Sequence, residues 1–188
     1  MTRGLTGTGF GPPIALVGPM AVGKSVIGHQ LAQQLGVPFV DTDAVIVEHH
    51  GTIADIFVGR GEHAFREIEA RTVGRVIEEA AGSGAVISLG GGAVLDSGTQ
   101  QILAGCTVVY LECDAATVAE RIARNTGRPL LAGDGMARWE ALFAARRPVY
   151  ERLADITVDV RSGTVAEIAL HLEERLRDHA ALKEEVQK

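Results

Sequence analysis

The chain has 188 residues, of which 46% are hydrophobic, and its formal net charge is −6. This length suits one domain with a full core, so we expect residues 1–188 to form a single domain. The acidic charge excludes a broad basic surface for nucleic acid or an anionic membrane. No apolar run has the length of a membrane-spanning helix, and the first thirteen residues lack the apolar stretch of a signal peptide. We therefore expect a cytoplasmic protein that has neither nucleic acid nor a membrane as a partner.

Short apolar segments alternate with helical patterns along the chain. The expected strands cover Ile14–Val17, 37–40, 85–89, 107–111 and 156–160. Several of them contain almost no polar residue, which is typical of strands buried on both faces. Apolar residues recur at helical spacing between them, as at Ile27, Leu31 and Leu35. This alternation predicts an α/β fold with a parallel sheet flanked by helices, and ligands beyond the carboxyl ends of the strands.

The two cysteines, Cys106 and Cys113, are seven residues apart at one expected strand. An odd separation places them on opposite faces of the sheet, where they cannot easily pair. We expect both to be reduced packing residues.

A glycine-containing motif follows the first expected strand and opens a helix. Residues 18–25 read Gly-Pro-Met-Ala-Val-Gly-Lys-Ser and fit the phosphate-loop pattern G-x-x-x-x-G-K-[ST]. Such a loop turns successive backbone N–H groups toward one anion, at the positive end of a helix. Lys24 can then reach the β- and γ-phosphates of a nucleotide, and the Ser25 hydroxyl can bind Mg²⁺. The only other lysines are Lys183 and Lys188, which favours a nucleotide site over a plain turn.

Acidic residues follow the second expected strand in the triplet Asp41-Thr42-Asp43. One carboxylate could lie near Mg²⁺, through water, while the other accepts the proton of a hydroxyl group. The triplet could instead be an N-cap cluster that starts a helix over residues 44–48, and Asp43 could have this role and no other. A guanine-nucleotide switch is disfavoured, because no Asn-Lys-x-Asp base-reading motif is present.

Three further segments suit a small anionic acceptor. Arg66 and Glu69 are three residues apart in a helical pattern, so the acid can orient the arginine toward a carboxylate. Three glycines at 90–92 follow the third expected strand and allow a ligand to approach the backbone. Arg128 lies in a loop that we interpret as a mobile lid, and Arg146 is another candidate anion contact.

Taken in order, these motifs resemble those of the shikimate kinase family. The matching pieces, which run from Val17 to Tyr150, are GxxxxGKS, Asp-Thr-Asp, Gly-Glu-x-x-Phe-Arg-x-x-Glu, Gly-Gly-Gly-Ala, Arg-Pro-Leu-Leu and Arg-x-Pro-x-Tyr. The resemblance implies a three-layer P-loop α/β sandwich with a five-stranded parallel sheet and a lid. It also implies transfer of the ATP γ-phosphate to the 3-hydroxyl of shikimate, Mg²⁺ as cofactor, and a monomer. In these terms residues 41–71 form a substrate-binding segment and residues 124–135 the lid.

The resemblance also implies a role for each matching residue. The residues implied at the nucleotide are Gly18, Ala21, Val22, Gly23, Lys24, Ser25, Val26, Arg121 and Arg128, with Arg121 packing against adenine. Mg²⁺ would lie at Ser25, with Asp41 behind its water shell. The residues implied at shikimate are Asp43, Arg66, Gly90, Gly91, Gly92 and Arg146. Lys24, Asp43 and Arg128 would be catalytic.

The chain departs from the family on the nucleotide side. Val26 stands where the family commonly has threonine, residues 19–22 replace a glycine- and serine-rich version of the loop, and residues 161–163 match the adenine-flanking loop poorly. Two alternatives therefore stay open: a kinase of gluconate or another polyol, and an ATP-binding module without catalysis. We interpret Trp139, Leu142 and Phe143 as helix packing, and we expect no zinc at His49, His50 or His63.

Overall fold

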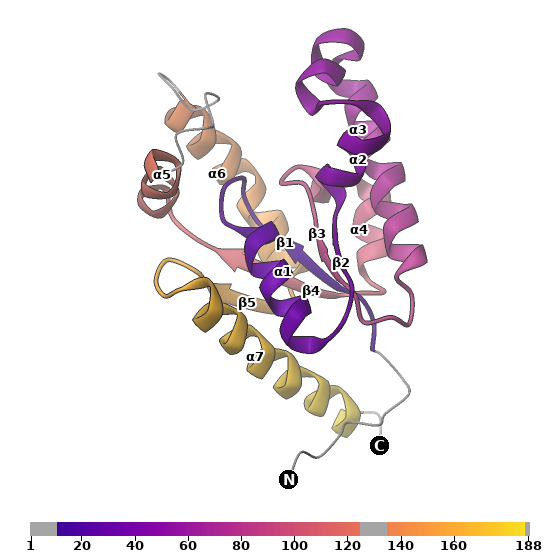
Figure 1. Ribbon diagram of the computed structural model, residues 1–188, viewed down its shortest axis with the longest axis vertical. Helices are drawn as coiled ribbons and strands as arrows, with labels where there is room; N and C mark the ends of the chain where they lie inside the picture. The colour runs from indigo at the N-terminus through magenta and orange to yellow at the C-terminus, as the bar shows by residue number, and fades with distance from the viewer. Residues whose placement is uncertain (1–10, 125–134, 187–188) are drawn as a thin grey trace.

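The computed structural model describes residues 11–124 and 135–186, which form one parallel sheet with helices on both faces (Figure 1). The five strands lie in the order β2-β3-β1-β4-β5. Their bounds are Ile14–Val17 for β1, Phe39–Asp41 for β2, Val86–Ser88 for β3, Thr107–Glu112 for β4 and Ile156–Asp159 for β5. The expected α/β class and parallel sheet are confirmed.

The helices connect successive strands and extend beyond the last one. They are α1 Lys24–Leu35, α2 Thr42–His50, α3 Ile53–Glu79, α4 Ser97–Leu103, α5 Ala115–Arg124, α6 Gly135–Leu153 and α7 Val165–Val186, with a short 3-10 turn η1 at Ala93–Leu95. No helix within the described ranges is both long and apolar enough to cross a membrane.

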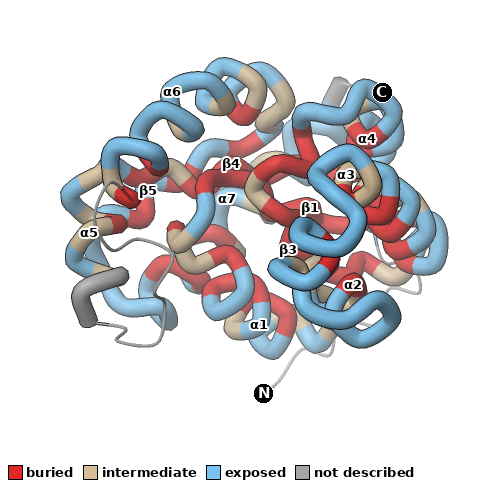
Figure 2. Tube along the Cα trace, turned by 90° about the horizontal axis from the view of Figure 1, so that it is seen from above, coloured by how far each residue is buried: buried red, intermediate tan, exposed pale blue. Residues whose placement is uncertain are grey.

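Two apolar clusters sandwich the sheet. α1 and α7 cover one face, where their side chains pack on strand residues such as Leu16 and Val109. α3 and α4 cover the opposite face and pack on strand residues such as Ala15 and Ile87. Figure 2 shows the buried strands enclosed by helices with exposed outer surfaces. Because β1, β3 and β4 are covered on both sides, their sequences are almost wholly apolar.

Cys106 and Cys113 flank β4 and are both buried and free. Cys106 belongs to the cluster under α3 and α4, whereas Cys113 belongs to the cluster under α1 and α7. The prediction of unpaired cysteines on opposite faces of the sheet is confirmed. Burial raises the pKa of each thiol to about 11, so both stay protonated at neutral pH.

The strand order brings three loops to one edge of the sheet. β3 lies between β2 and β1, so the carboxyl ends of these three strands are neighbours. The phosphate motif follows β1, the acidic triplet follows β2, and the three glycines follow β3. Parallel strands therefore collect the sequence motifs of the candidate site at one place.

Candidate active site

The loop at residues 18–25 bends sharply between β1 and α1. Gly18 has φ 143°, Gly23 has φ 102°, and Ala21 adopts the left-handed region with φ 65°. A Cβ atom on Gly18 would lie 2.8 Å from the carbonyl oxygen of Leu111, so only glycine fits beside β4 at this position. The loop thus meets the backbone and packing requirements of a phosphate-binding loop.

Lys24 starts α1 and folds back over the loop. Its Nζ donates hydrogen bonds of 2.9 Å to the carbonyl oxygens of both Gly18 and Pro19, and the residue is only 9% exposed. The ammonium group is therefore held at the position where the phosphates of a nucleotide would lie, in a partly desolvated environment that strengthens its field.

Ser25 and Asp41 meet at the adjoining strand ends. The Ser25 hydroxyl donates a 2.5 Å hydrogen bond to Oδ2 of Asp41. The other carboxylate oxygen of Asp41 accepts hydrogen bonds from the backbone N–H groups of Asp43 and Ala44, at 3.0 and 3.2 Å. Asp41 therefore caps α2, which begins at Thr42, so the acidic triplet does supply a helix cap, but Asp43 lies in the first turn and is not the cap.

These oxygen atoms fit Mg²⁺. The ion is held in nucleotide enzymes by one or two protein oxygens together with phosphate oxygens and water, rather than by a complete protein cage. Ser25 and Asp41 offer such a pair. Among the described residues, no group of three His, Cys, Asp or Glu side chains could hold a metal ion by itself.

Asp43 lies near Lys24 of the phosphate loop and Arg66 of α3. Burial raises the pKa of its carboxyl group, and the nearby charge of Asp41 raises it further. The charges of Lys24 and Arg66 act in the opposite direction without cancelling the shift. A carboxylate with a raised pKa that lies near both an ammonium and a guanidinium group is suited to accept a proton.

Arg66 is oriented by two acids of its own helix. Its Nη1 donates a 2.7 Å hydrogen bond to Glu69, which is buried, and its Nη2 lies 3.3 Å from Glu62, which is exposed. α3 breaks its helical geometry at Gly61, with φ 81°, just before this cluster. The part of α3 that carries Arg66 and Glu69 is thus preceded by another helical segment, which begins at Ile53.

The three glycines form a floor beneath these charged groups. A Cβ on Gly90 would lie 2.5 Å from Oε1 of Glu69 and 2.8 Å from Oδ1 of Asp43. A Cβ on Gly92 would lie 2.3 Å from Nη1 of Arg66. A side chain at Gly90 or Gly92 would therefore displace these charged groups, a reason for glycine that the sequence did not reveal.

α6 brings Arg146 and Tyr150 next to the three glycines. The Arg146 guanidinium affects the pKa values of Glu69 and Tyr150, so it lies near both. The Tyr150 hydroxyl donates a hydrogen bond to the carbonyl oxygen of Gly91. Burial raises the pKa of Tyr150 to about 12, and Arg146 opposes that shift, so this hydroxyl stays a donor at neutral pH.

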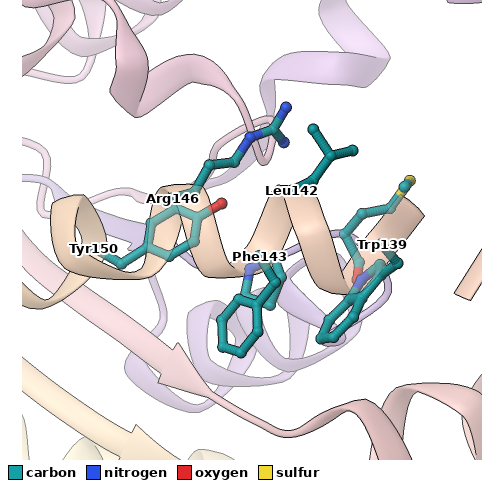
Figure 3. A pocket seen from close by; sticks show the side chains of 7 residues that line it. Trp139, Leu142, Phe143, Arg146 and Tyr150 are labelled. Carbon is teal, nitrogen blue, oxygen red and sulfur yellow. The ribbon is translucent and has the colours of Figure 1, made fainter. Parts of the chain in front are cut away.

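A small pocket separates α6 from the phosphate loop (Figure 3). Its lining residues are Pro19, Met20, Trp139, Leu142, Phe143, Arg146 and Tyr150. Trp139 is only 3% exposed, in agreement with a packing role, whereas Leu142 is 37% exposed. The sequence did not predict the hydrogen bonds that Trp139 and Tyr150 donate to the carbonyl oxygens of Met20 and Gly91. Helical spacing indicates which side chains are buried, but it does not indicate the hydrogen-bond partners of their polar atoms.

The remaining nucleotide-side residues differ in their surroundings. Val26 is 60% exposed on the first turn of α1. Arg121 donates to the carbonyl oxygens of Val22 and Val160 and so ties the phosphate loop to the end of β5. Arg128 lies outside the described residues.

The phosphate-loop motif with its buried Lys24 therefore lies beside a charged cluster that contains Asp43, Arg66 and Glu69. That combination defines the class of the protein as a P-loop kinase of a small molecule.

Comparison with known proteins gives the family within this class. The family model for shikimate kinase matches residues 20–177. A shikimate kinase from Rhodococcus jostii is 42% identical over 169 residues, which is 89% of this chain and 99% of that protein. The solved structure of a shikimate kinase from Acinetobacter baumannii in complex with shikimate aligns with a TM-score of 0.82 and 30% identity, over 89% of this chain and 94% of that one. The chain belongs to the shikimate kinase family.

A gluconokinase from Sinorhizobium meliloti also aligns, with a TM-score of 0.65 and 23% identity, over 95% of this chain and 97% of that one. At this identity the likeness shows the fold alone. It gives no support to gluconate as the acceptor.

Proposed function

We propose that this protein transfers the γ-phosphoryl group of ATP to the 3-hydroxyl of shikimate. The observation that carries the proposal is the position of Asp43. Its carboxyl group lies near enough to Lys24 of the phosphate loop and to Arg66 of the acceptor side for both charges to lower its pKa. Donor and acceptor would then meet at one carboxylate. Family membership supports the same reaction.

On the donor side, the backbone of residues 18–25 would bind the phosphates and Lys24 would neutralise charge on the β- and γ-phosphates. Ser25 and Asp41 would hold Mg²⁺, with Asp41 acting through water. When bound, Mg²⁺ screens the negative charge of the phosphates and lowers the barrier to attack. Arg121 would pack against adenine, and we assign Val26 to the same site.

On the acceptor side, Arg66 and Arg146 would bind the carboxylate of shikimate, because guanidinium groups match carboxylates with paired hydrogen bonds. Asp43 and the backbone of Gly90, Gly91 and Gly92 would contact its hydroxyl groups. The segment 41–71 thus serves as the acceptor-binding part of a single domain.

The reaction would proceed by in-line attack. The 3-hydroxyl oxygen forms a bond to the γ-phosphorus while the bond from that phosphorus to the β–γ bridging oxygen breaks, and ADP leaves with the bond's electron pair. Asp43 accepts the hydroxyl proton. We assign Arg128 to the transferring phosphoryl group and residues 124–135 to a lid that excludes water. We also propose that the protein acts as a monomer in the cytoplasm, where ATP is available.

The test is Mg²⁺-dependent release of ADP from ATP with shikimate, with gluconate and with no acceptor. We expect rapid release with shikimate only. Release with gluconate alone would overturn the acceptor assignment, whereas ATP binding without release under any condition would favour a non-catalytic module.

A further inference from the structure

Helix α6 contacts the phosphate loop through the only tryptophan of the chain. The indole Nε1 of Trp139 donates a 2.9 Å hydrogen bond to the carbonyl oxygen of Met20. The indole ring is buried and packs on Phe143 with its centroid 5.0 Å away. The N–H group is thus a fixed donor inside the protein, where a missing acceptor would be costly.

The hydrogen bond lies next to a strained position. Ala21 has φ 65° and is the only non-glycine residue with positive φ in the described ranges. An L-residue with a Cβ is destabilised in this left-handed region and leaves it unless its surroundings hold it there. The Met20 carbonyl belongs to the peptide group that joins Met20 to Ala21, so a bond to this oxygen restrains the rotation that would release the strain.

Other donors bind the neighbouring carbonyl oxygens of the loop. Lys24 binds those of Gly18 and Pro19, and Arg121 binds that of Val22. In the function proposed above, Lys24 also interacts with the phosphates of the nucleotide. The bond from Trp139 then restrains the middle of the loop independently of Lys24.

We propose that Trp139 is a positioning residue for the nucleotide site. Its N–H group holds the Met20 carbonyl toward α6, keeps Ala21 left-handed and thereby leaves the N–H groups of the loop directed at the phosphates. The inference rests on the proposed role of the loop in ATP binding. It offers a reason why this chain can use alanine in a loop that is usually richer in glycine.

The test uses Trp139→Phe, which keeps an aromatic ring against Phe143 and removes the donor together with part of the buried ring volume. Calorimetric titration with ADP in the presence of Mg²⁺ should show a Kd about 3- to 10-fold higher than in the wild type. The Kd for shikimate should stay within about twofold, because Arg146 lies two turns farther along the same helix. Equal weakening of both ligands would mean general damage to α6 and would overturn the proposal, as would an unchanged Kd for ADP.

A second variant tests the link to Ala21. Glycine adopts positive φ without strain, so Ala21→Gly in the Trp139→Phe background should recover at least half of the lost ADP affinity on a logarithmic scale. Additive effects of the two changes would contradict the mechanism.

A measurement on the wild type covers the case in which the variant does not fold. The single indole N–H resonance should shift when ADP binds and stay in place when only shikimate binds. No shift with saturating ADP would overturn the proposal. Failure of the wild type to bind ADP at all would instead overturn the proposed function, and the inference with it.

Discussion

Asp43 is the residue on which the proposed chemistry depends most. Its carboxyl group is buried near Asp41, Lys24 and Arg66, and its pKa is raised by burial first and by Asp41 second. A base must be ionised to accept a proton, so kcat should fall as the pH decreases through this raised pKa. The acid limb of the pH profile should therefore lie above the range of an ordinary aspartate.

Asp43→Asn should lower kcat by about 10²- to 10⁴-fold and leave the Kd for ADP within about twofold. A large loss of ADP affinity would contradict the role.

Because the native pKa of Asp43 lies above the unfolded value, its ionised form destabilises the fold at neutral pH. The variant should consequently have a higher Tm than the wild type at pH 7, and the difference should disappear as acid protonates Asp43 in the wild type.

Gly92 lies against Arg66 in the proposed acceptor site. A Cβ at this position would lie 2.3 Å from Nη1 of Arg66, the end of a flexible side chain. Gly92→Ala should therefore displace Arg66, raise the KM for shikimate at least tenfold and change Tm little. Gly74→Ala is a matched control in α3, since its Cβ would make an ordinary 3.5 Å contact with Ile102. If both variants had the wild-type KM, the placement of Arg66 at the acceptor would be wrong.

Helix α2 shares its N-terminal cap, Asp41, with the proposed Mg²⁺ site. Asp41 accepts the backbone N–H groups of Asp43 and Ala44 through one oxygen and the Ser25 hydroxyl through the other. Asparagine caps a helix as well as aspartate does, but it carries no charge for a hydrated cation. Substitutions of Asp41 can therefore distinguish its contribution to the stability of α2 from its contribution to the binding of Mg²⁺.

Asp41→Asn should keep the Tm within a few degrees and raise the Mg²⁺ concentration needed for half-maximal activity. Asp41→Ala should show the same Mg²⁺ effect and in addition lose about 1 kcal/mol of stability, the usual contribution of a cap. Unchanged Mg²⁺ dependence in both variants, measured by activity over a magnesium titration, would remove Asp41 from the metal site.

Most helices and strands were predicted from the spacing of apolar residues along the chain. The differences between the predicted and observed elements have local causes. The first strand was predicted at its observed bounds because every one of its side chains is buried. The helical segment over 53–60 was missed although Ile53, Ile56 and Phe57 stand at helical spacing, because glycines at 51, 59 and 61 are typical of a loop. α2 begins two residues earlier than predicted because Asp41, rather than a later residue, supplies the cap.

At the scale of the whole molecule, the sheet places the two cysteines in separate cores. Because both thiols are buried with pKa values of about 11, we expect Ellman's reagent to react with them only after the protein opens. The labelling rate should rise with urea in parallel with global unfolding, and ADP with shikimate should slow it. Immediate reaction of either thiol in the folded protein would contradict this arrangement of the core.

The motifs also predicted which residues gather at one end of the sheet, because parallel strands place their carboxyl ends together. What the sequence did not show is how those residues hold one another. The contacts of the glycine floor with Glu69 and Arg66, and the bonds from Trp139 and Tyr150 to loop carbonyls, depend on side-chain directions across elements distant in sequence. Such contacts produce no regular spacing of residues in the sequence from which they could be predicted.

The most direct test of the central claim is the identity of the phosphorylated product. Proton and phosphorus NMR of a reaction containing the protein, ATP, Mg²⁺ and shikimate should show one phosphate ester, coupled to the proton at carbon 3, in equal amount to ADP. Lys24→Ala should abolish it. Inorganic phosphate in place of the ester, or an ester at another hydroxyl, would contradict the proposed alignment of Asp43 with the acceptor.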